Sequence, residues 1–244
     1  MMHHPDFIKQ LNTGLTRASI PDHATLIVAF SGGPDSSALL AGLSILSGKK
    51  CFNLIACHIN HQIRLDSCER DQIAAKYIAE SLGIEFSSTT VNVPKISKQQ
   101  KISIETAARK IRYESLRELS EKYNAHGVVT GHTRDDQAET VLFHAGRGTG
   151  LKGLAGMDYR STLRFPHSEI KLTVLRPLLD TSRSTIIDYC KQRGIQTVND
   201  ASNDDREYTR NKIRLDVLPA LAVATPGAKS ALARLAENAS DDLE

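Results

Sequence analysis

A glycine turn near the start of the chain has the residue types of an anion-binding site. Its residues are Ser31, Gly32, Gly33, Pro34, Asp35, Ser36 and Ser37, with an apolar segment before them and an apolar helical pattern after them. Two adjacent glycines let the backbone turn sharply and bring successive N–H groups close to a phosphate. The positive end of the following helix and the three serine hydroxyls add further donors. The turn therefore predicts a phosphate-binding site.

The turn differs from the two commonest nucleotide-binding loops. It has no lysine and no G-K-[ST] ending, and it lacks the pattern G-x-G-x-x-G. Asp35 would repel phosphates unless a divalent cation lay between them, so we expect Mg²⁺ at Asp35. The alternative is an ordinary turn in which Asp35 or Ser36 caps a helix. The position of the pattern between a buried strand and a helix favours the phosphate site.

A histidine and three acidic residues follow a later predicted strand. His132 comes at the end of that strand, where open α/β sheets bind ligands, although a packed histidine explains it equally well. Asp135, Asp136 and Glu139 lie at the start of a predicted helix, and Asp136 and Glu139 share one face because they are three residues apart. Acidic residues in a first turn also offset the helix dipole. Capping alone does not explain three carboxylates beside a phosphate-binding edge.

Basic residues gather in three stretches of the sequence. They include Arg109 and Arg112 on one predicted helix, Arg147 and Lys152 around a glycine-rich loop, and Arg206, Arg210 and Arg214 near the C-terminus. Because the net charge is only +3, a nucleic-acid partner must be argued from such local patches. A solvated helix face explains the first stretch as well, whereas the loop has the composition of a surface that follows an RNA backbone.

Strand and helix patterns alternate through the first 145 residues. Strand patterns cover 24–30, 52–59, 85–91 and 127–130, and helical patterns cover 37–46, 66–82, 103–122 and 135–144. This alternation predicts an α/β fold, an open parallel sheet with helices on both faces. Beyond it we expect an edge strand at 171–175, a helix at 182–192 and another helix that is broken by Pro219.

We divide the chain into a catalytic domain, 1–219, and a linker-like C-terminal helix, 220–244. Within the domain we expect an N-terminal helix in 1–20, and a glycine-rich basic loop with a helical extension in 146–219.

The composition is that of an ordinary globular protein, with 40% of the residues hydrophobic and 24% charged. No apolar run reaches the length of a membrane span and no secretory signal is visible, so we expect a cytoplasmic protein without a membrane partner. The four cysteines form no C-x-x-C pair, which disfavours thiol and metal-cluster chemistry. We expect Cys51 and Cys57 to be buried strand residues.

The pattern S-G-G-x-D-S after the first strand resembles the signature of the PP-loop ATP pyrophosphatases, which have an adenine nucleotide alpha hydrolase-like fold. These enzymes split ATP between the α and β phosphates. Further segments resemble, in order, the tRNA(Ile)-lysidine synthetase family within that superfamily. They are HINHQIR at 58–64, SIETAARKIRY at 103–113, TGHTRDDQAET at 130–140, RGTGL at 147–151, LRPLL at 175–179, DASN at 200–203 and RNKIR at 210–214.

The resemblance implies ATP and Mg²⁺ as cofactors, and free lysine and tRNA(Ile) as partners. A cytidine oxygen of the tRNA would be adenylated, and lysine would then displace AMP. The implied catalytic residues are Asp35, Arg112, His132 and Asp136. ATP would be bound by residues 31–37, His132 and Arg210, and lysine by Asp136 and Glu139. The implied tRNA contacts are Arg109, Arg112, Arg147, Lys152, Arg206 and Arg214.

Two alternatives stay open beside the ligase. A tRNA thiolase of the same superfamily would need a persulfide-bearing cysteine or a cluster-binding C-x-x-C, and a nucleotide-binding sensor would leave the acidic and basic clusters without a task. Longer members of the resembled family carry C-terminal domains that bind the tRNA stem. Either the natural protein is minimal or this chain is a catalytic-core fragment, and we expect a fragment to bind tRNA more weakly and less selectively. For the oligomeric state, a homodimer is one of the predicted partner arrangements.

Overall fold

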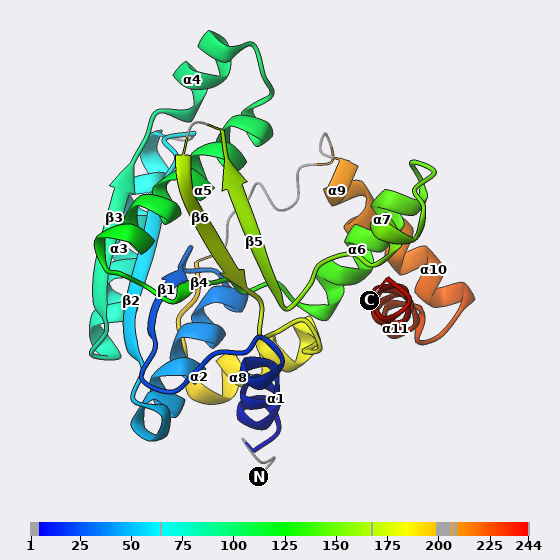
Figure 1. Cartoon of the computed structure of the whole chain (residues 1–244), viewed down its shortest axis with the longest axis horizontal. Helices are drawn as coiled ribbons and strands as arrows, with labels where there is room; N and C mark the ends of the chain where they lie inside the picture. The colour runs from blue at the N-terminus through cyan, green and yellow to red at the C-terminus, as the bar shows by residue number, and fades with distance from the viewer. Residues whose placement is uncertain (1–4, 64, 167, 199–205, 207–208, 244) are drawn as a thin grey trace.

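A computed structural model describes residues 5–63, 65–166, 168–198, 206 and 209–243. Its centre is a six-stranded sheet with the order β3-β2-β1-β4-β6-β5 (Figure 1). The strands are β1 (Thr25–Ala29), β2 (Asn53–Asn60), β3 (Glu85–Thr90), β4 (Gly127–Val129), β5 (Arg160–Phe165) and β6 (Ser168–Leu175). All neighbouring pairs are parallel except β5 and β6, which are antiparallel. The predicted open parallel sheet is confirmed.

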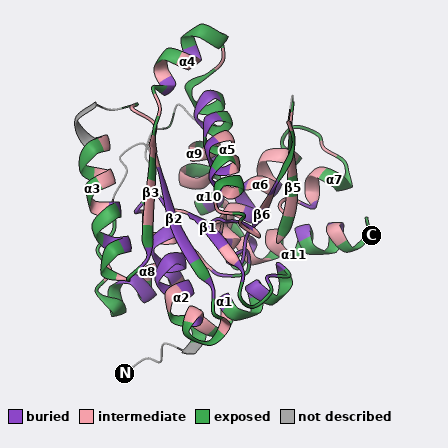
Figure 2. Ribbon diagram, turned by 60° about the vertical axis from the view of Figure 1, so that its left-hand side comes forward, coloured by how far each residue is buried: buried purple, intermediate pink, exposed green. Residues whose placement is uncertain are grey.

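Helices cover both faces of this sheet. The first face carries α1 (Pro5–Arg17), α2 (Pro34–Lys50), α3 (Leu65–Ser81) and α8 (Arg183–Arg193), and the second carries α5 (Ile104–Lys122). In β1, Leu26 and Val28 point to the first core, whereas Ile27 between them points to the second. Side chains alternate across a strand, so a central parallel strand needs apolar residues at every position. Figure 2 accordingly shows β1 and β2 as mostly buried.

The second half of the chain departs from the sequence prediction in three places. The stretch 171–175 is not an edge strand, because β6 pairs with β4 on one side and with β5 on the other. The edge strand β5 was not predicted, because alternate residues of it are exposed and it contains two arginines and few apolar residues. Pro219 does not break a helix: it lies in the first turn of α10 (Leu218–Ala224), where its missing N–H costs nothing.

Four further helices complete the fold; α4 packs on α5, whereas the other three lie near α6 (Arg134–Ala145). They are α4 (Val93–Gln100), α7 (Leu151–Leu154), α9 (Thr209–Lys212) and α11 (Ala228–Asp241), and a π-helical turn, η2 (Ile213–Val217), joins α9 to α10. The segment expected to be linker-like contains α11, which lies against α6 and α7 (Figure 1). Its Ala228, Ala236 and Ala239 are buried.

Two remaining expectations concern cysteines and membranes. Cys57 is buried in β2 as expected, but the prediction for Cys51 is wrong. Cys51 is exposed and follows α2 in a left-handed backbone conformation, φ 53°, because the helix extends to Lys50. In the described part of the chain, no helix combines the length and apolar character needed to cross a bilayer.

Candidate active site

The glycine turn links β1 to α2 and is shaped by its own hydroxyls. Ser37 Oγ donates to the Gly32 carbonyl at 3.0 Å, and Ser36 Oγ donates to the Gly33 carbonyl at 3.1 Å. Gly32 has φ +82°, a conformation that strains residues with a side chain. Gly33 precedes the first turn of α2 and provides no side-chain cap. The turn thus keeps a fixed shape and leaves the start of α2 uncapped by a side chain, as an anion site requires.

Two other segments approach this turn closely. A Cβ placed on Gly131 would lie 3.1 Å from the Asp35 carbonyl carbon and 3.2 Å from the Ser36 nitrogen, so a side chain there would push the turn aside by a few tenths of an ångström. On the other side, the Val198 N–H donates to the Gly32 carbonyl at 2.8 Å. Gly131 follows β4, and the order of the sheet reverses between β1 and β4. The turn therefore lies at the topological switch point, where open α/β sheets bind ligands.

Asp35 in the turn has one oxygen without a partner. Its Oδ1 is buried and makes no hydrogen bond within the described residues, while Oδ2 lies 3.8 Å from Nη1 of Arg183. Burial raises the pKa of Asp35 to about 6, against the opposing effect of Arg183. An orphaned carboxylate oxygen suits a cation shared with a ligand, since Mg²⁺ is commonly held by one or two carboxylates plus phosphates. Within the described residues, no group of three or more His, Cys, Asp or Glu side chains could hold a metal on its own.

Asp136 caps α6 with one carboxylate oxygen and binds a cation with the other. Its Oδ2 accepts hydrogen bonds from the N–H and the hydroxyl of Thr133, both at 2.8 Å. Its Oδ1 accepts from Nη2 of Arg210 at 3.3 Å. Oε2 of Glu139 accepts from Nε of the same guanidinium at 3.0 Å, and only 6% of the Glu139 side chain is exposed. The two predicted lysine-binding carboxylates thus meet, and together they already hold a cation.

Asp135, the third carboxylate, has a different environment. Its Oδ1 pairs with Nζ of Lys229 on α11 at 2.7 Å, and its Oδ2 accepts from the Arg183 N–H at 2.9 Å. These contacts tie the start of α6 to α11 and to the start of α8, so Asp135 has a structural task. Its pKa is lowered: burial raises it, but the hydrogen bonds from Lys229 and Arg183 outweigh that effect.

His132 lies among the same charged groups. Its Nδ1 is 2.8 Å from the Thr130 hydroxyl. Burial lowers the pKa of His132 to about 4, and Arg112 and Arg210 lower it further while Asp136 opposes them. The imidazole is therefore neutral at pH 7, and Arg112 and Arg210 both lie near it.

The other predicted tRNA-binding residues do not converge on this site as one group. Arg109 stacks over Tyr113 at 5.1 Å, Arg147 over Phe143 at 3.8 Å, and Arg206 pairs with Asp216 at 3.2 Å; Lys152 lines a cavity of about 960 Å³ between α7, α11 and the start of β5. Arg214 lies nearer to the site, since its charge lowers the pKa of both Asp35 and Glu139. The segment 200–203, which carries part of the family resemblance, is outside the described residues.

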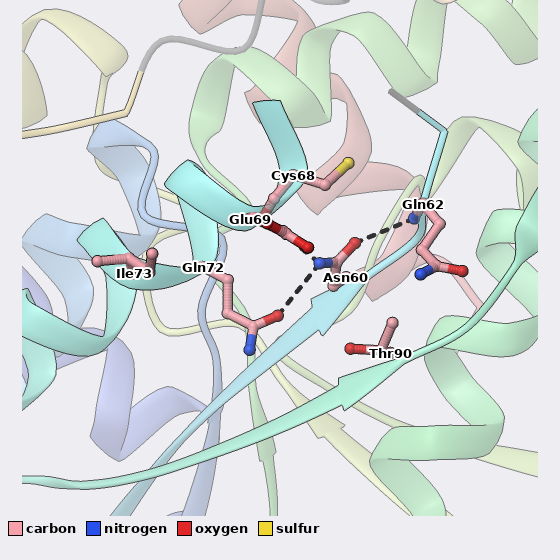
Figure 3. A pocket seen from close by; sticks show the side chains of 7 residues that line it. All are labelled: Asn60, Gln62, Cys68, Glu69, Gln72, Ile73 and Thr90. Carbon is pink, nitrogen blue, oxygen red and sulfur yellow. Dashed lines mark hydrogen bonds between the residues drawn. The ribbon is translucent and has the colours of Figure 1, made fainter. Parts of the chain in front are cut away.

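A smaller polar recess of about 320 Å³ opens on the same edge of the sheet (Figure 3). Asn60, the last residue of β2, donates from Nδ2 to Oε1 of Gln72 on α3 at 3.1 Å, and its own Oδ1 accepts from the Gln62 N–H at 3.1 Å. Thr90 at the end of β3 closes the other side. Sequence reasoning did not identify this recess.

Sequence reasoning also missed Arg183, Thr133 and Gly131. Arg183 had a usable signal: a basic residue in the first turn of a helix opposes the helix dipole, and such a residue calls for an anionic partner. Thr133 had one too, since Thr-x-x-Asp before a helix is a capping pattern. Gly131 has to be small because the backbone of Asp35, about 100 residues away in sequence, comes close to it. No local sequence pattern predicts such a contact.

The fold is an open sheet with an anion-binding turn at its switch point, and a carboxylate pair lies opposite the turn. These features define the class of nucleotide-binding α/β proteins. A family model described as a PP-loop domain matches residues 4–221, and the chain belongs to this family.

The chain is similar in sequence to proteins of about twice its length. The tRNA(Ile)-lysidine synthase of Clostridioides difficile is 40% identical over 216 residues, which cover 87% of this chain and 44% of the relative. That of Bacteroides thetaiotaomicron is 36% identical over 222 residues, covering 91% and 49%. The chain thus spans about half the length of these relatives or less.

Solved structures support the fold. A U34-tRNA thiolase from Methanococcus maripaludis superposes with a TM-score of 0.78 at 20% identity, covering 96% of this chain and 78% of that one. An NH3-dependent NAD synthetase from Campylobacter jejuni gives 0.54 at 14% identity, covering 100% and 97%. At these identities the likeness concerns the fold alone.

Proposed function

We propose that the chain is the catalytic part of an ATP-dependent ligase that joins free lysine to the wobble cytidine of tRNA(Ile) with a CAU anticodon. The observation that carries the proposal is the carboxylate pair of Asp136 and Glu139, which holds a cation beside the glycine turn. A site for triphosphate next to a site for an amine is what such a ligase needs. The named relatives, lysidine synthases at 36–40% identity, support the same reaction.

In the first step, O2 of the cytosine attacks the α-phosphorus of ATP. The bond from that phosphorus to the bridging oxygen breaks, and the electron pair leaves on pyrophosphate. Residues 31–37 would hold the phosphates by N–H groups and hydroxyls. Mg²⁺, held by Asp35 and the phosphates, would neutralise charge that builds up on the leaving group. His132 fits a neutral donor to the α-phosphate, because its pKa is far below 7.

In the second step, the side-chain amine of lysine attacks C2 of the adenylated cytosine and AMP leaves. Asp136 and Glu139 would bind amino groups of the lysine in place of the Arg210 guanidinium. Lysine enters as an ammonium ion and must lose a proton before it attacks. Exchange of one cation for another keeps the nearly buried Glu139 paired throughout, which avoids the cost of an isolated buried charge.

The tRNA would approach across the basic residues. Arg112, near His132, is our candidate contact for the adenylated base, with Arg109 beside it on α5. Arg147, Lys152, Arg206 and Arg214 are proposed contacts for the RNA backbone. Arg210 stays our candidate for the ATP phosphates, which requires lysine to take its place on the carboxylates before the first step. A ligase acting on tRNA would work in the cytoplasm. The homodimer stays a prediction.

The thiolase alternative is less well supported. Burial raises the pKa of the Cys57 thiol to about 12 and that of Cys190 to about 11, so neither is a nucleophile at neutral pH. Cys51 lies at the end of α2, opposite the carboxyl edge of the sheet that carries the glycine turn. Cys68, which lines the polar recess on the carboxyl edge, is therefore the cysteine that a thiolase would have to use. A nucleotide sensor would account for the turn but gives the Asp136–Glu139 pair no substrate to hold.

The experiment is incubation with radiolabelled lysine, ATP, Mg²⁺ and a tRNA(Ile) transcript. We expect lysine on the tRNA together with AMP, and loss of both with Glu139→Gln. Glu118→Gln, an exposed change on α5, serves as the control. Sulfur incorporation from a sulfide donor would favour the thiolase, and binding of ATP without any turnover would favour the sensor. Either result contradicts the proposal.

A further inference from the structure

Arg147, just after the end of α6, packs its guanidinium against an aromatic ring. The guanidinium carbon lies 3.8 Å from the centroid of the Phe143 ring, closer than in the other cation–aromatic contacts of the described residues, which span 4.3–5.9 Å. At this separation the two planar groups are in van der Waals contact. Phe143 in turn packs against the buried cluster of Ala138, Ile213 and Leu218. The ring is therefore a fixed base for the guanidinium.

The outward side of this guanidinium is open. Arg147 is exposed, and its contact with Phe143 is the one interaction that its side chain makes within the described residues. A Cβ built on Gly148 or on Gly150 would meet nothing within 4 Å. The loop between α6 and α7 lies at the outer edge of the molecule (Figure 1). A flat group can therefore approach the arginine from solvent.

The backbone around Arg147 is held by hydrogen bonds on both sides. Its N–H donates to the His144 carbonyl at 3.0 Å, and the Gly148 N–H donates to the Ala145 carbonyl at the same distance. Nδ1 of His144 lies 2.8 Å from the Gly153 carbonyl, and because a carbonyl only accepts, this nitrogen carries the proton. These bonds connect α6, the loop and α7, so the arginine is in place before a ligand binds. Such preorganisation lowers the entropy cost of binding.

The chemistry of this surface fits an unpaired base of RNA. Nucleobases are flat and have a π-face, and splayed bases of single-stranded RNA stack on the planes of arginine guanidinium groups. Lys152 on α7 adds a second positive charge, which suits a polyanion. A guanidinium that offers its face to a base keeps the N–H donors on its edges, so the same side chain can also contact a phosphate.

The position of Arg147 along α6 decides which base is meant. Asp136, in the first turn of this helix, belongs to the candidate active site, whereas Arg147 follows the last turn. With a rise of about 1.5 Å per residue, the helix separates the two by roughly 14 Å. A base that stacks on Arg147 is therefore a neighbour of the reacting cytidine and not that cytidine itself.

We propose that Arg147 is the stacking platform for an unpaired base of the anticodon loop that neighbours the reacting cytidine. This inference rests on the proposed function, because it takes tRNA as the substrate. It adds a contact with a base to the contact with the RNA backbone, so Arg147 acts through its planar shape as well as its charge.

The test is a double-mutant cycle between the protein and the RNA. Fluorescence anisotropy measures the affinity of the wild type, Arg147→Lys and Arg193→Lys for an anticodon stem-loop RNA, and for RNAs in which one loop base at a time is replaced by an abasic site. Arg147→Lys keeps the charge and removes the plane. Arg193 is the matched control, because it is an exposed arginine at a helix end with its guanidinium carbon 5.9 Å from the centroid of the Tyr189 ring.

For Arg147→Lys we expect a loss of about 5- to 10-fold on the intact RNA, the lower part of the range for stacking of a base, and no loss on the RNA that lacks the docked base. Arg193→Lys should bind every RNA as the wild type does. Both changes are at exposed positions, so the melting temperatures should match that of the wild type.

The remaining outcomes decide against the inference or separate it from the ligase. A loss that is the same on every RNA assigns Arg147 a phosphate contact or a role in the loop structure, and overturns the inference while leaving the ligase intact. Equal binding of the intact RNA by the wild type and Arg147→Lys overturns it as well. If the wild type does not bind the RNA, the proposed function fails and the inference with it. A base-dependent loss in a protein that transfers no lysine would keep the inference and remove the ligase.

Discussion

Arg210→Met removes the cation that the Asp136–Glu139 pair holds. It deletes two charge-assisted hydrogen bonds, at 3.0 and 3.3 Å. Such bonds contribute about 1.5–3 kcal/mol each when buried, but Arg210 is 37% exposed and Asp136 24%, so solvent screening reduces the sum to about 2 kcal/mol. In a domain of this size we expect the melting temperature to fall by roughly 4–8 °C.

The loss should depend on pH. Burial already raises the pKa of Glu139, and Asp136 adds to this while Arg210 opposes it, so the variant raises that pKa further. A carboxyl whose pKa is higher in the folded than in the unfolded protein destabilises the fold as the pH rises through the folded value. The drop should therefore be larger near about pH 8 than near about pH 5.

Free lysine should restore the variant. With Arg210 gone, the ammonium group of lysine has no competitor for the two carboxylates, and a ligand that binds only the folded state raises its stability. The assay is thermal denaturation with and without millimolar lysine, and with norleucine, which lacks the side-chain amine. Arg206→Met, which breaks an exposed ion pair with Asp216, is the control and should shift little. A pH-independent loss, or equal effects of lysine and norleucine, would refute the reasoning.

Three further predictions follow from the contacts of the site. Gly131→Ala would press on the Asp35 backbone at 3.1 Å, so the KM for ATP should rise more than the melting temperature falls; unchanged ATP kinetics would contradict this. Lys229→Ala breaks a half-exposed pair with Asp135 and should lower stability by about 0.5–1 kcal/mol with lysine affinity unaltered, as calorimetry and denaturation would measure. His132 has a pKa near 4, so its proton signal in NMR should not titrate between about pH 6 and 8; a midpoint in that range would count against its burial.

The central strands and the turn were accessible from sequence because their signals are local. An apolar run in front of Gly-Gly-x-Asp-Ser predicts β1, the turn and α2, and the structure has all three in those places. That Asp136 and Glu139 bind the same cation could also be predicted from the sequence, because residues three apart on a helix share a face.

The partners of those carboxylates were not accessible in the same way. Arg210 reaches Glu139 across 71 positions, and it does so from a four-residue helix that is followed by a π-helical turn. Neither the short helix nor the π turn has a sequence signature. The hairpin of β5 and β6 was half missed for a related reason: β5 is exposed on alternate residues at the edge of the sheet, so its hydrophobic pattern is weak.

The central claim is that the turn at 31–37 holds the triphosphate of ATP at the switch point of the sheet. A crystal structure with Mg²⁺ and a non-hydrolysable ATP analogue tests it most directly. We predict the phosphates against the start of α2, with the cation on Oδ1 of Asp35. A nucleotide bound elsewhere, or a turn left empty at saturating analogue, would contradict the account.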